Sequence, residues 1–313
     1  MIVDSLTWLD RRAAALLAAA LAVGLLLPDL ASLLRPLLTP AVIGLLASAL
    51  LRIDWTEVRS HARRPLRAAL LLFWLMVATP LIVWAALSVF PISATLATVL
   101  VLWASSPVLT AVPAYALLFG IDAALALLAV LATSVLQPLV QPALALMLLG
   151  LEIEIGAGAL MLRLALIVVA SFAIAAVARL WLGRERLRRA GPAIGGVAVV
   201  MLIVFAIGVM DGVTAALLAD PSRVVLFSAA AFIASFALQA LGAIMFWRLE
   251  RGAALAAALA SGNRNMAILI AAIGPAAHPD FGLFFAVVQF PIYLLPAILG
   301  PLYRRAARDV SDD

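Results

Sequence analysis

A cluster of polar residues interrupts a long apolar run near the C-terminal end of the chain. Ser261, Gly262, Asn263, Arg264 and Asn265 lie within GAALAAALASGNRNMAILIAAIG. A guanidinium carries a permanent charge and five N–H donors, and an asparagine amide both donates and accepts hydrogen bonds. Such groups could bind an anionic solute, or they could hold the ends of an interrupted helix together. Arg264 is therefore the leading candidate for a functional charge.

A second polar cluster lies in the stretch WASSPVLTAVPAY, residues 103–115. Pro107 and Pro113 each lack a backbone N–H and clash with the preceding helical turn. The hydroxyls of Ser105, Ser106 and Thr110 can bond the carbonyls that are released in this way. We therefore predict a broken helix here, with its polar residues contributing to a binding site.

Residues that could perform catalysis are scarce. The chain has two histidines, His61 and His278, and no cysteine. Both histidines fall in predicted loops on opposite faces of the membrane, and the sequence contains no HExxH, GxSxG or phosphate-binding glycine motif. The sequence thus predicts neither an enzyme nor a metal site, and it requires no cofactor.

Membrane helices must position the two polar clusters. The 313 residues are 67% hydrophobic and 12% charged, with a mean hydropathy of +1.21, against about 45–50% apolar and about 25% charged in soluble domains. Because each crossing needs about 20 apolar residues, we predict an all-α integral membrane protein of about ten helices with no separate soluble domain. The predicted helices lie near 13–28, 33–51, 66–90, 93–117, 122–149, 158–182, 191–210, 221–247, 252–274 and 281–302.

The arginines indicate the orientation of these helices. If the N-terminus is cytoplasmic, seventeen of the 21 arginines lie in inside-facing segments, and only Arg35, Arg163 and Arg223 lie outside. This positive-inside distribution predicts a multi-pass protein of a bacterial-type inner (plasma) membrane with both termini cytoplasmic. The basic loops are interpreted as topological anchors facing the lipid bilayer, so no nucleic-acid partner is expected.

Arg264 belongs to neither group, because it lies midway along the predicted helix 252–274. An aqueous loop at this point would leave two pieces of roughly ten residues, each too short to span a bilayer. We therefore interpret SGNRN as a break inside the membrane rather than as a loop.

The ten predicted helices divide into two sets of five, residues 1–150 and 151–313, within one membrane domain. Because five is odd, the second set enters from the opposite side, which makes the halves an inverted repeat. The helices 93–117 and 252–274 then hold matching positions. Paired discontinuous helices of this kind are typical of a transporter binding site near the bilayer midplane, so we expect the two breaks to cross or face each other.

At these breaks the sequence resembles the bile acid:sodium symporter family, as a divergent bacterial member. The stretch SSPVLTAVPAYALLFGIDAALALLAVLATSVLQPLVQP is similar to the first crossover and the helix after it, and SGNRNMAILIAA resembles the family's Glu-x-Gly-x-Gln-Asn crossover. LLTPAVIGLLASALLRIDWTEV, residues 37–58, resembles the second helix. Asp122, Thr133 and Ser134 fall at similar spacing after the first break and are candidates for coupling, and Asp122 is also expected to cap the helix that follows it.

The resemblance implies a panel made of the first, second, sixth and seventh helices and a core made of the other six, with substrate and sodium meeting at the crossover. The family's sodium-binding glutamate and glutamine correspond here to Ala260 and Arg264. Its Ser-Asn pair falls near Val112 and Pro113, whose side chains cannot bind sodium. We therefore hypothesise that Arg264 takes the electrostatic place of sodium, either by holding the half-helices together or by facing an anionic substrate.

The sequence thus predicts a secondary active transporter that moves an organic anion of the carboxylate type by alternating access, and the hypothesis for Arg264 adds that this transport is independent of sodium. Two alternatives stay open: an auxin-efflux-type carrier of similar architecture, and a membrane sensor or scaffold that does not transport. The direction of transport, the coupling ion and the oligomeric state are also open, and a monomer is compatible with the sequence.

Overall fold

The computed structural model describes residues 6, 8–9, 12–52, 65–90, 92–149, 156–273 and 279–308. Within these residues the regular elements are helices, and the only β-type pairing is one isolated bridge between Val108 and Arg264. The predicted all-α class is confirmed for this part of the chain. His61 and His278 lie outside the described residues.

The chain forms two compact units, each assembled from separate segments. Unit 1 comprises residues 1–53, 163–224 and 267–286, and unit 2 comprises 54–162, 225–266 and 287–313. The helices expected in the panel fall in unit 1, and those expected in the core fall in unit 2, except that 267–286 groups with unit 1. The units thus cut across the predicted halves 1–150 and 151–313, and the inverted repeat stays a prediction.

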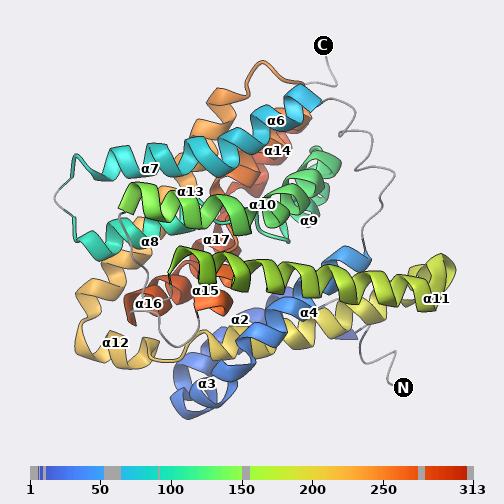
Figure 1. Cartoon of the computed structure of the whole chain (residues 1–313), viewed down its shortest axis with the longest axis horizontal. Helices are drawn as coiled ribbons and strands as arrows, with labels where there is room; N and C mark the ends of the chain where they lie inside the picture. The colour runs from blue at the N-terminus through green and yellow to red at the C-terminus, as the bar shows by residue number, and fades with distance from the viewer. Residues whose placement is uncertain are drawn as a thin grey trace. The chain divides into compact units, whose positions relative to one another are not determined.

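In unit 2, one long rod begins with α6 (Pro65–Phe73), continues through a π-helical turn, η2 (Trp74–Ala78), and ends with α7 (Thr79–Leu87). The chain then turns back into α8 (Ala94–Ala104), which packs against α7 (Figure 1). Ser93 caps α8 by accepting a hydrogen bond from the Leu96 N–H at 3.2 Å. After an interruption come α9 (Val112–Phe119) and α10 (Ala123–Leu149), and α10 runs alongside the rod.

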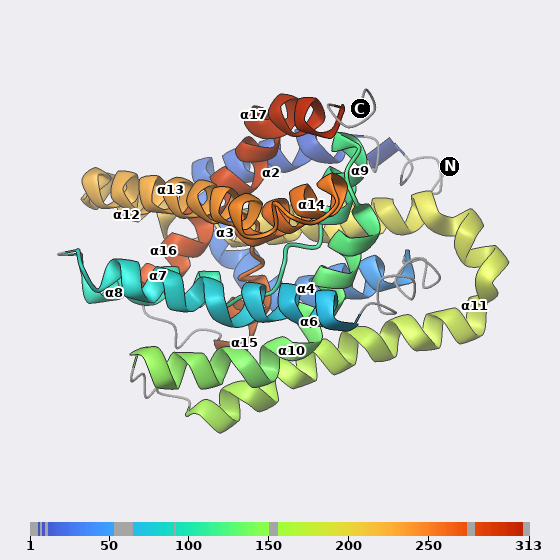
Figure 2. The ribbon, with the colours of Figure 1, turned by 90° about the horizontal axis from the view of Figure 1, so that it is seen from above.

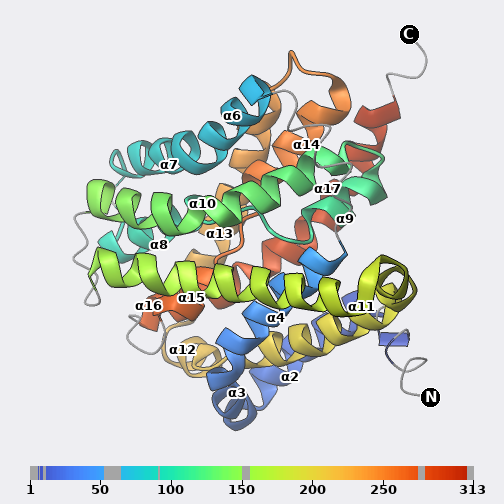
Figure 3. The same cartoon turned by 45° about the vertical axis from the view of Figure 1, so that its right-hand side comes forward.

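Three other helices complete unit 2. They are most of α13 (Pro221–Met245), α14 (Arg251–Gly262) and α17 (Gln289–Arg308). α14 packs against α9, α10 and α17, and α9 packs against α17 (Figure 3). Alanines supply much of the buried face of α14, which lets neighbouring backbones approach closely.

Unit 1 contains the N-terminal helices, most of the longest helix and the second half of the second broken helix. Its elements are α2 (Ala13–Leu26), α3 (Pro28–Leu34), η1 (Arg35–Leu37), α4 (Leu38–Leu51), most of α11 (Ala157–Gly208), α12 (Val213–Ala219), α15 (Ala267–Ile273) and nearly all of α16 (Pro279–Val287). α15 packs against α4, and α12 packs against α2.

The predicted loop between 182 and 191 is corrected by the structure. Helical backbone continues through this stretch, and the interruption is confined to Gly183, which has φ 69° and ψ 163°. A residue with a Cβ rarely adopts this conformation, so a single glycine turns α11 back on itself (Figure 2). Charged residues such as Glu185 and Arg189 pair along the helix surface at 3.0 Å, which favours helix over loop.

Seven described helical segments are long and apolar enough to cross a membrane. They coincide with seven of the ten predicted crossings. The other three predicted crossings correspond to α2, with 14 residues, and to the two broken helices, whose pieces are shorter still. A multi-pass membrane protein is thus established, whereas the count of ten and the cytoplasmic termini stay predictions.

Candidate functional site

Both predicted breaks are present, and they pair with each other inside unit 2. α8 ends at Ala104 and α9 begins at Val112, while α14 ends at Gly262 and α15 begins at Ala267. The Leu109 N–H donates to the Asn263 carbonyl at 2.9 Å, and the Asn265 N–H donates to the Pro107 carbonyl at 2.7 Å. These two bonds flank the antiparallel bridge that joins Val108 to Arg264. The backbone groups freed by one break are thus satisfied by the other.

The hydroxyls of two serines close the end of α8, as the sequence predicted for these residues. The hydroxyls of Ser105 and Ser106 donate to the Leu102 carbonyl at 3.0 and 2.8 Å. The amide of Gln141, from α10, donates to the same carbonyl at 2.9 Å and to the Ser106 hydroxyl at 3.0 Å. Thr110 is partly buried in the turn before α9, and Pro113 is the second residue of α9, a position that proline tolerates.

Arg264 is fully buried at the centre of this arrangement. Its Nε donates to the Ser261 carbonyl at 2.9 Å, and its Nη2 donates to the Thr79 hydroxyl at 2.8 Å. Its Nη1 donates to the Leu75 carbonyl at 2.8 Å and, more weakly, to the Ser106 carbonyl at 3.4 Å. One guanidinium therefore joins the rod, the first break and the second break.

The carbonyl of Leu75 is available because the rod is irregular at this point. In η2 the Thr79 N–H bonds to the Trp74 carbonyl, five residues back, instead of to Leu75. The next residue, Pro80, has no N–H to offer. The Leu75 carbonyl is left without a backbone donor, and it accepts from the Thr79 hydroxyl at 3.0 Å and from Arg264. Such π-helical turns are frequent at functional sites.

The charge of Arg264 is balanced by dipoles rather than by a carboxylate. Ser261 and Ser106 lie at the C-terminal ends of α14 and α8, where unpaired carbonyls carry partial negative charge. Within the residues that the structure describes, no carboxylate forms an ion pair with Arg264. A central charge costs about 2.5–3.5 kcal/mol even on the lenient insertion scale, so the convergence of acceptors here is needed to hold it.

These residues do not fit a sodium ion at the position of Arg264. Sodium is a hard cation that needs several oxygen ligands, as its divalent analogues do. The carbonyls of Ser261 and Leu75 already accept from the guanidinium, and the Ala260 side chain supplies no oxygen. Arg264 is the resident cation of the crossover.

Gly262 serves a different purpose from the one the sequence suggested. A glycine at a helix break often permits the angles of a turn, but Gly262 is the last residue of α14 and its φ is not positive. A Cβ on Gly262 would lie 2.1 Å from the Ser235 carbonyl oxygen and 2.5 Å from Gln239 Cγ. The glycine is thus required by the close approach of α14 to α13. The Ser235 hydroxyl donates to the Gly262 carbonyl at 2.5 Å across the same contact.

Three further candidates lie around the breaks. The Asn263 amide donates to the Leu259 carbonyl at 2.8 Å, and its buried side-chain oxygen has no hydrogen-bond partner among the described residues. The Ser261 hydroxyl accepts from the Trp74 indole N–H at 2.8 Å and donates to the Ala257 carbonyl. Asn265 is partly buried just before α15. Direct contact of any of these groups with a solute stays a prediction.

The coupling candidates have structural roles in the described fold. The Thr133 hydroxyl accepts from the Val108 N–H at 3.0 Å and so supports the first break from α10. The Ser134 hydroxyl donates to the Val130 carbonyl within its own helix. Asp122 accepts from the Leu125 N–H at 2.8 Å and caps the start of α10, as expected. Their roles in coupling stay predictions.

Sequence reasoning missed the contribution of the rod. Leu75 and Thr79 hold Arg264, and Trp74 bonds Ser261, yet the sequence at 66–90 was interpreted as an ordinary helix. The proline at position 80 was the available signal, because a proline inside a helix always leaves carbonyls without donors. Gln141 could have been found as a polar residue inside an apolar helix.

A helical membrane chain whose two broken helices pair at their breaks has the arrangement of a secondary transporter. The model of the Sodium Bile acid symporter family matches residues 17–221. The match covers more than half of the chain, which therefore belongs to that family. A comparison with curated protein sequences gives no significant match.

Membership in this family makes the chain a membrane transporter of the bile acid symporter type, which lies in a lipid bilayer and acts on small solutes. Members of the family are transporters rather than enzymes, and the match favours this type over an auxin-efflux-type carrier. The matched range ends before the second break, so SGNRN and Arg264 lie outside it.

Proposed function

We propose that the chain is a secondary active transporter of an organic carboxylate, working by alternating access without sodium. The observation that carries the sodium independence in this proposal is the position of Arg264. Its guanidinium lies where the C-terminal ends of α8 and α14 meet, and it bonds the carbonyls of Ser261 and Leu75. The guanidinium balances the partial negative charge of these helix ends, so a bound sodium ion is not required for that purpose.

Of the two roles hypothesised for Arg264, its contacts support the first, in which it holds the half-helices together. The side chain is fully buried, and each of its three nitrogens donates to a protein acceptor. A guanidinium committed in this way has little capacity left for a solute. The carboxylate class of the substrate therefore rests on the family, whose members act on bile acid-type solutes, and not on Arg264.

Uptake by vesicles reconstituted with the purified protein tests the substrate class. Radiolabelled cholate and 4-phenylbutyrate should accumulate faster than in protein-free vesicles, whereas the corresponding neutral amides should not, because the carboxylate charge is what the protein recognises. Equal protein-dependent uptake of acid and amide would contradict the carboxylate class. Saturable binding of these acids without any uptake would instead indicate a sensor or scaffold and would overturn the proposed transport.

A further inference from the structure

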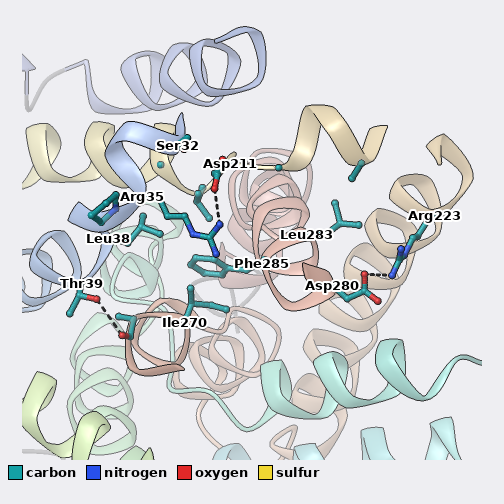
Figure 4. A pocket seen from close by; sticks show the side chains of 17 residues that line it. Ser32, Arg35, Leu38, Thr39, Asp211, Arg223, Ile270, Asp280, Leu283 and Phe285 are labelled. Carbon is teal, nitrogen blue, oxygen red and sulfur yellow. Dashed lines mark hydrogen bonds and ion pairs between the residues drawn. The ribbon is translucent and has the colours of Figure 1, made fainter. Parts of the chain in front are cut away.

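Unit 1 contains a cavity of about 760 Å³ that takes no part in the crossover. Its walls come from η1 and the start of α4, the turn between α11 and α12, the start of α13, and α15 and α16 (Figure 4). This volume falls within the range of about 300–1,000 Å³ that is typical of small-molecule sites. All residues that line it belong to unit 1.

Two ion pairs lie in the wall of the cavity, and both expose the arginine more than the carboxylate. Arg35 Nη1 lies 2.7 Å from Asp211 Oδ2, with the side chains 51% and 20% exposed. Arg223 pairs with Asp280, with the side chains 44% and 5% exposed. The accessible charge is therefore mainly positive, which favours an anionic ligand although the four charges sum to zero.

The Arg35 guanidinium has more N–H donors than its ion pair with Asp211 uses. Among the described residues its guanidinium forms one hydrogen bond, from Nη1 to Asp211. A guanidinium offers five N–H groups in a planar fork that matches a carboxylate. In Figure 4 the Arg35 guanidinium lies between Asp211 and Phe285, within the cavity. A ligand carboxylate can thus bind Arg35 without first breaking the ion pair.

The remainder of the wall near Arg35 is largely apolar. Leu38, Ile270, Leu283 and Phe285 line the cavity together with Arg35 (Figure 4). Sites for small organic molecules typically combine such apolar walls with a few polar groups that fix orientation. The lining therefore suits a molecule with a carboxylate at one end and an apolar body.

The arginines of this region are also the exceptions to the charge distribution of the chain. Of the three predicted outside the cytoplasm, Arg35 and Arg223 line the cavity. The third, Arg163, donates to the Ala272 carbonyl at 3.2 Å without lining it. The positive-inside rule does not explain arginines on the outer side of the membrane. Binding of an anionic ligand in the cavity would explain two of them, Arg35 and Arg223.

We propose that this cavity binds an organic carboxylate with an apolar body, and that Arg35 binds its carboxylate group. The ligand class is the one given to the substrate above, and to that extent the inference rests on the proposed function. The site uses none of the crossover residues, and binding to it does not require transport.

Photolabelling of the purified full chain in lipid nanodiscs tests the site. The probe is 4-benzoylbenzoate, whose ketone crosslinks to nearby C–H groups under ultraviolet light, and its neutral amide is the chemical control. The carboxylate should label peptides that contain Ile270, Leu283 or Phe285. The amide should label them about tenfold less, because a neutral amide cannot form the charge-assisted hydrogen bond that a carboxylate forms with a guanidinium. Equal labelling by acid and amide, or no labelling of these peptides by the acid, would overturn the site.

Three variants separate binding from structural support. Arg35→Gln should lower labelling by the acid about tenfold, as expected for the loss of a charge-assisted bond. Arg163→Gln, the matched control, should label like the wild type. Asp211→Asn breaks the same ion pair as Arg35→Gln but leaves Arg35 with more free donors, so it should keep or raise labelling. A loss in Asp211→Asn equal to that in Arg35→Gln would overturn the proposal, as would undiminished labelling in Arg35→Gln.

The outcomes also separate this site from the proposed transport. Labelling that depends on Arg35 in a protein that takes up no carboxylate would contradict the transport proposal alone. Uptake by a protein whose labelling does not depend on Arg35 would contradict the cavity site alone.

Discussion

Replacing Arg264 by alanine is expected to abolish transport and to lower the stability of the protein by about 3 kcal/mol, because several buried hydrogen bonds to a charged group are lost at once. The truncation removes the donors to the carbonyls of Ser261 and Leu75 and to the Thr79 hydroxyl. The Leu75 carbonyl keeps the Thr79 hydroxyl as a donor, but a buried acceptor that loses its donor costs about 1–3 kcal/mol. The two breaks also lose the cation that joins them to the rod. Thermal unfolding in detergent and uptake in vesicles measure the two effects.

Arg251 provides a matched control for this substitution. It is the first residue of α14, the same helix, but it is exposed and donates to the Ala306 carbonyl at 3.0 Å. Arg251→Ala should cost less than about 1 kcal/mol, as exposed charged contacts generally do. Arg264→Lys should fall between the two, since an ammonium keeps the charge but is too compact to reach all of these acceptors. Wild-type uptake by Arg264→Ala would show that the buried cation is not needed.

The second large effect is expected from adding one methyl group at Gly262. In an ordinary helix interior, replacing glycine by alanine stabilises by roughly 0.5–1 kcal/mol. Here the new Cβ would lie 2.1 Å from the Ser235 carbonyl oxygen, a backbone atom that cannot rotate away. α14 must then move off α13, and the second break moves with it. We expect Gly262→Ala to lose about 3 kcal/mol, the upper end for overpacking, and most of its transport.

Gly158→Ala is the control for this prediction. Gly158 lies in α11, and a Cβ there would meet no atom within 4 Å in the part of the chain that the structure describes. The variant should melt at the wild-type temperature or slightly above it, because only the backbone entropy of the unfolded chain changes. If Gly262→Ala had the same melting temperature as Gly158→Ala, α13 and α14 would not approach each other in solution as closely as the structure shows.

The two breaks could be predicted because residue types that disfavour a continuous membrane helix cause them. Pro107 cannot continue a hydrogen-bonded helix, and Arg264 cannot face lipid without partners. The partners themselves could not be predicted. Leu75 contributes only its carbonyl, which every residue has, and it is free only because the rod adopts a π-helical turn before Pro80. Because every residue type has a backbone carbonyl, the sequence does not reveal which carbonyl will accept a hydrogen bond from a side chain.

The cavity of unit 1 could not be predicted from the sequence, for a different reason. Arg35 and Asp211 are 176 positions apart, and only the assembled unit brings them to 2.7 Å. The charge distribution singled out Arg35 as an exception, but it gave no indication of what the residue would contact. The loop predicted between 182 and 191 was wrong for a different reason. Its basic residues were interpreted as a loop, whereas they are helical and the single residue Gly183 forms the turn.

If Arg264 stands in place of sodium, transport by the wild-type protein does not depend on a sodium gradient. Initial rates of carboxylate uptake would be measured in reconstituted vesicles, with an inward sodium gradient and with an equal gradient of potassium. We predict the same rate in both, because the crossover carries its own cation. A rate several-fold higher with sodium than with potassium would contradict this account.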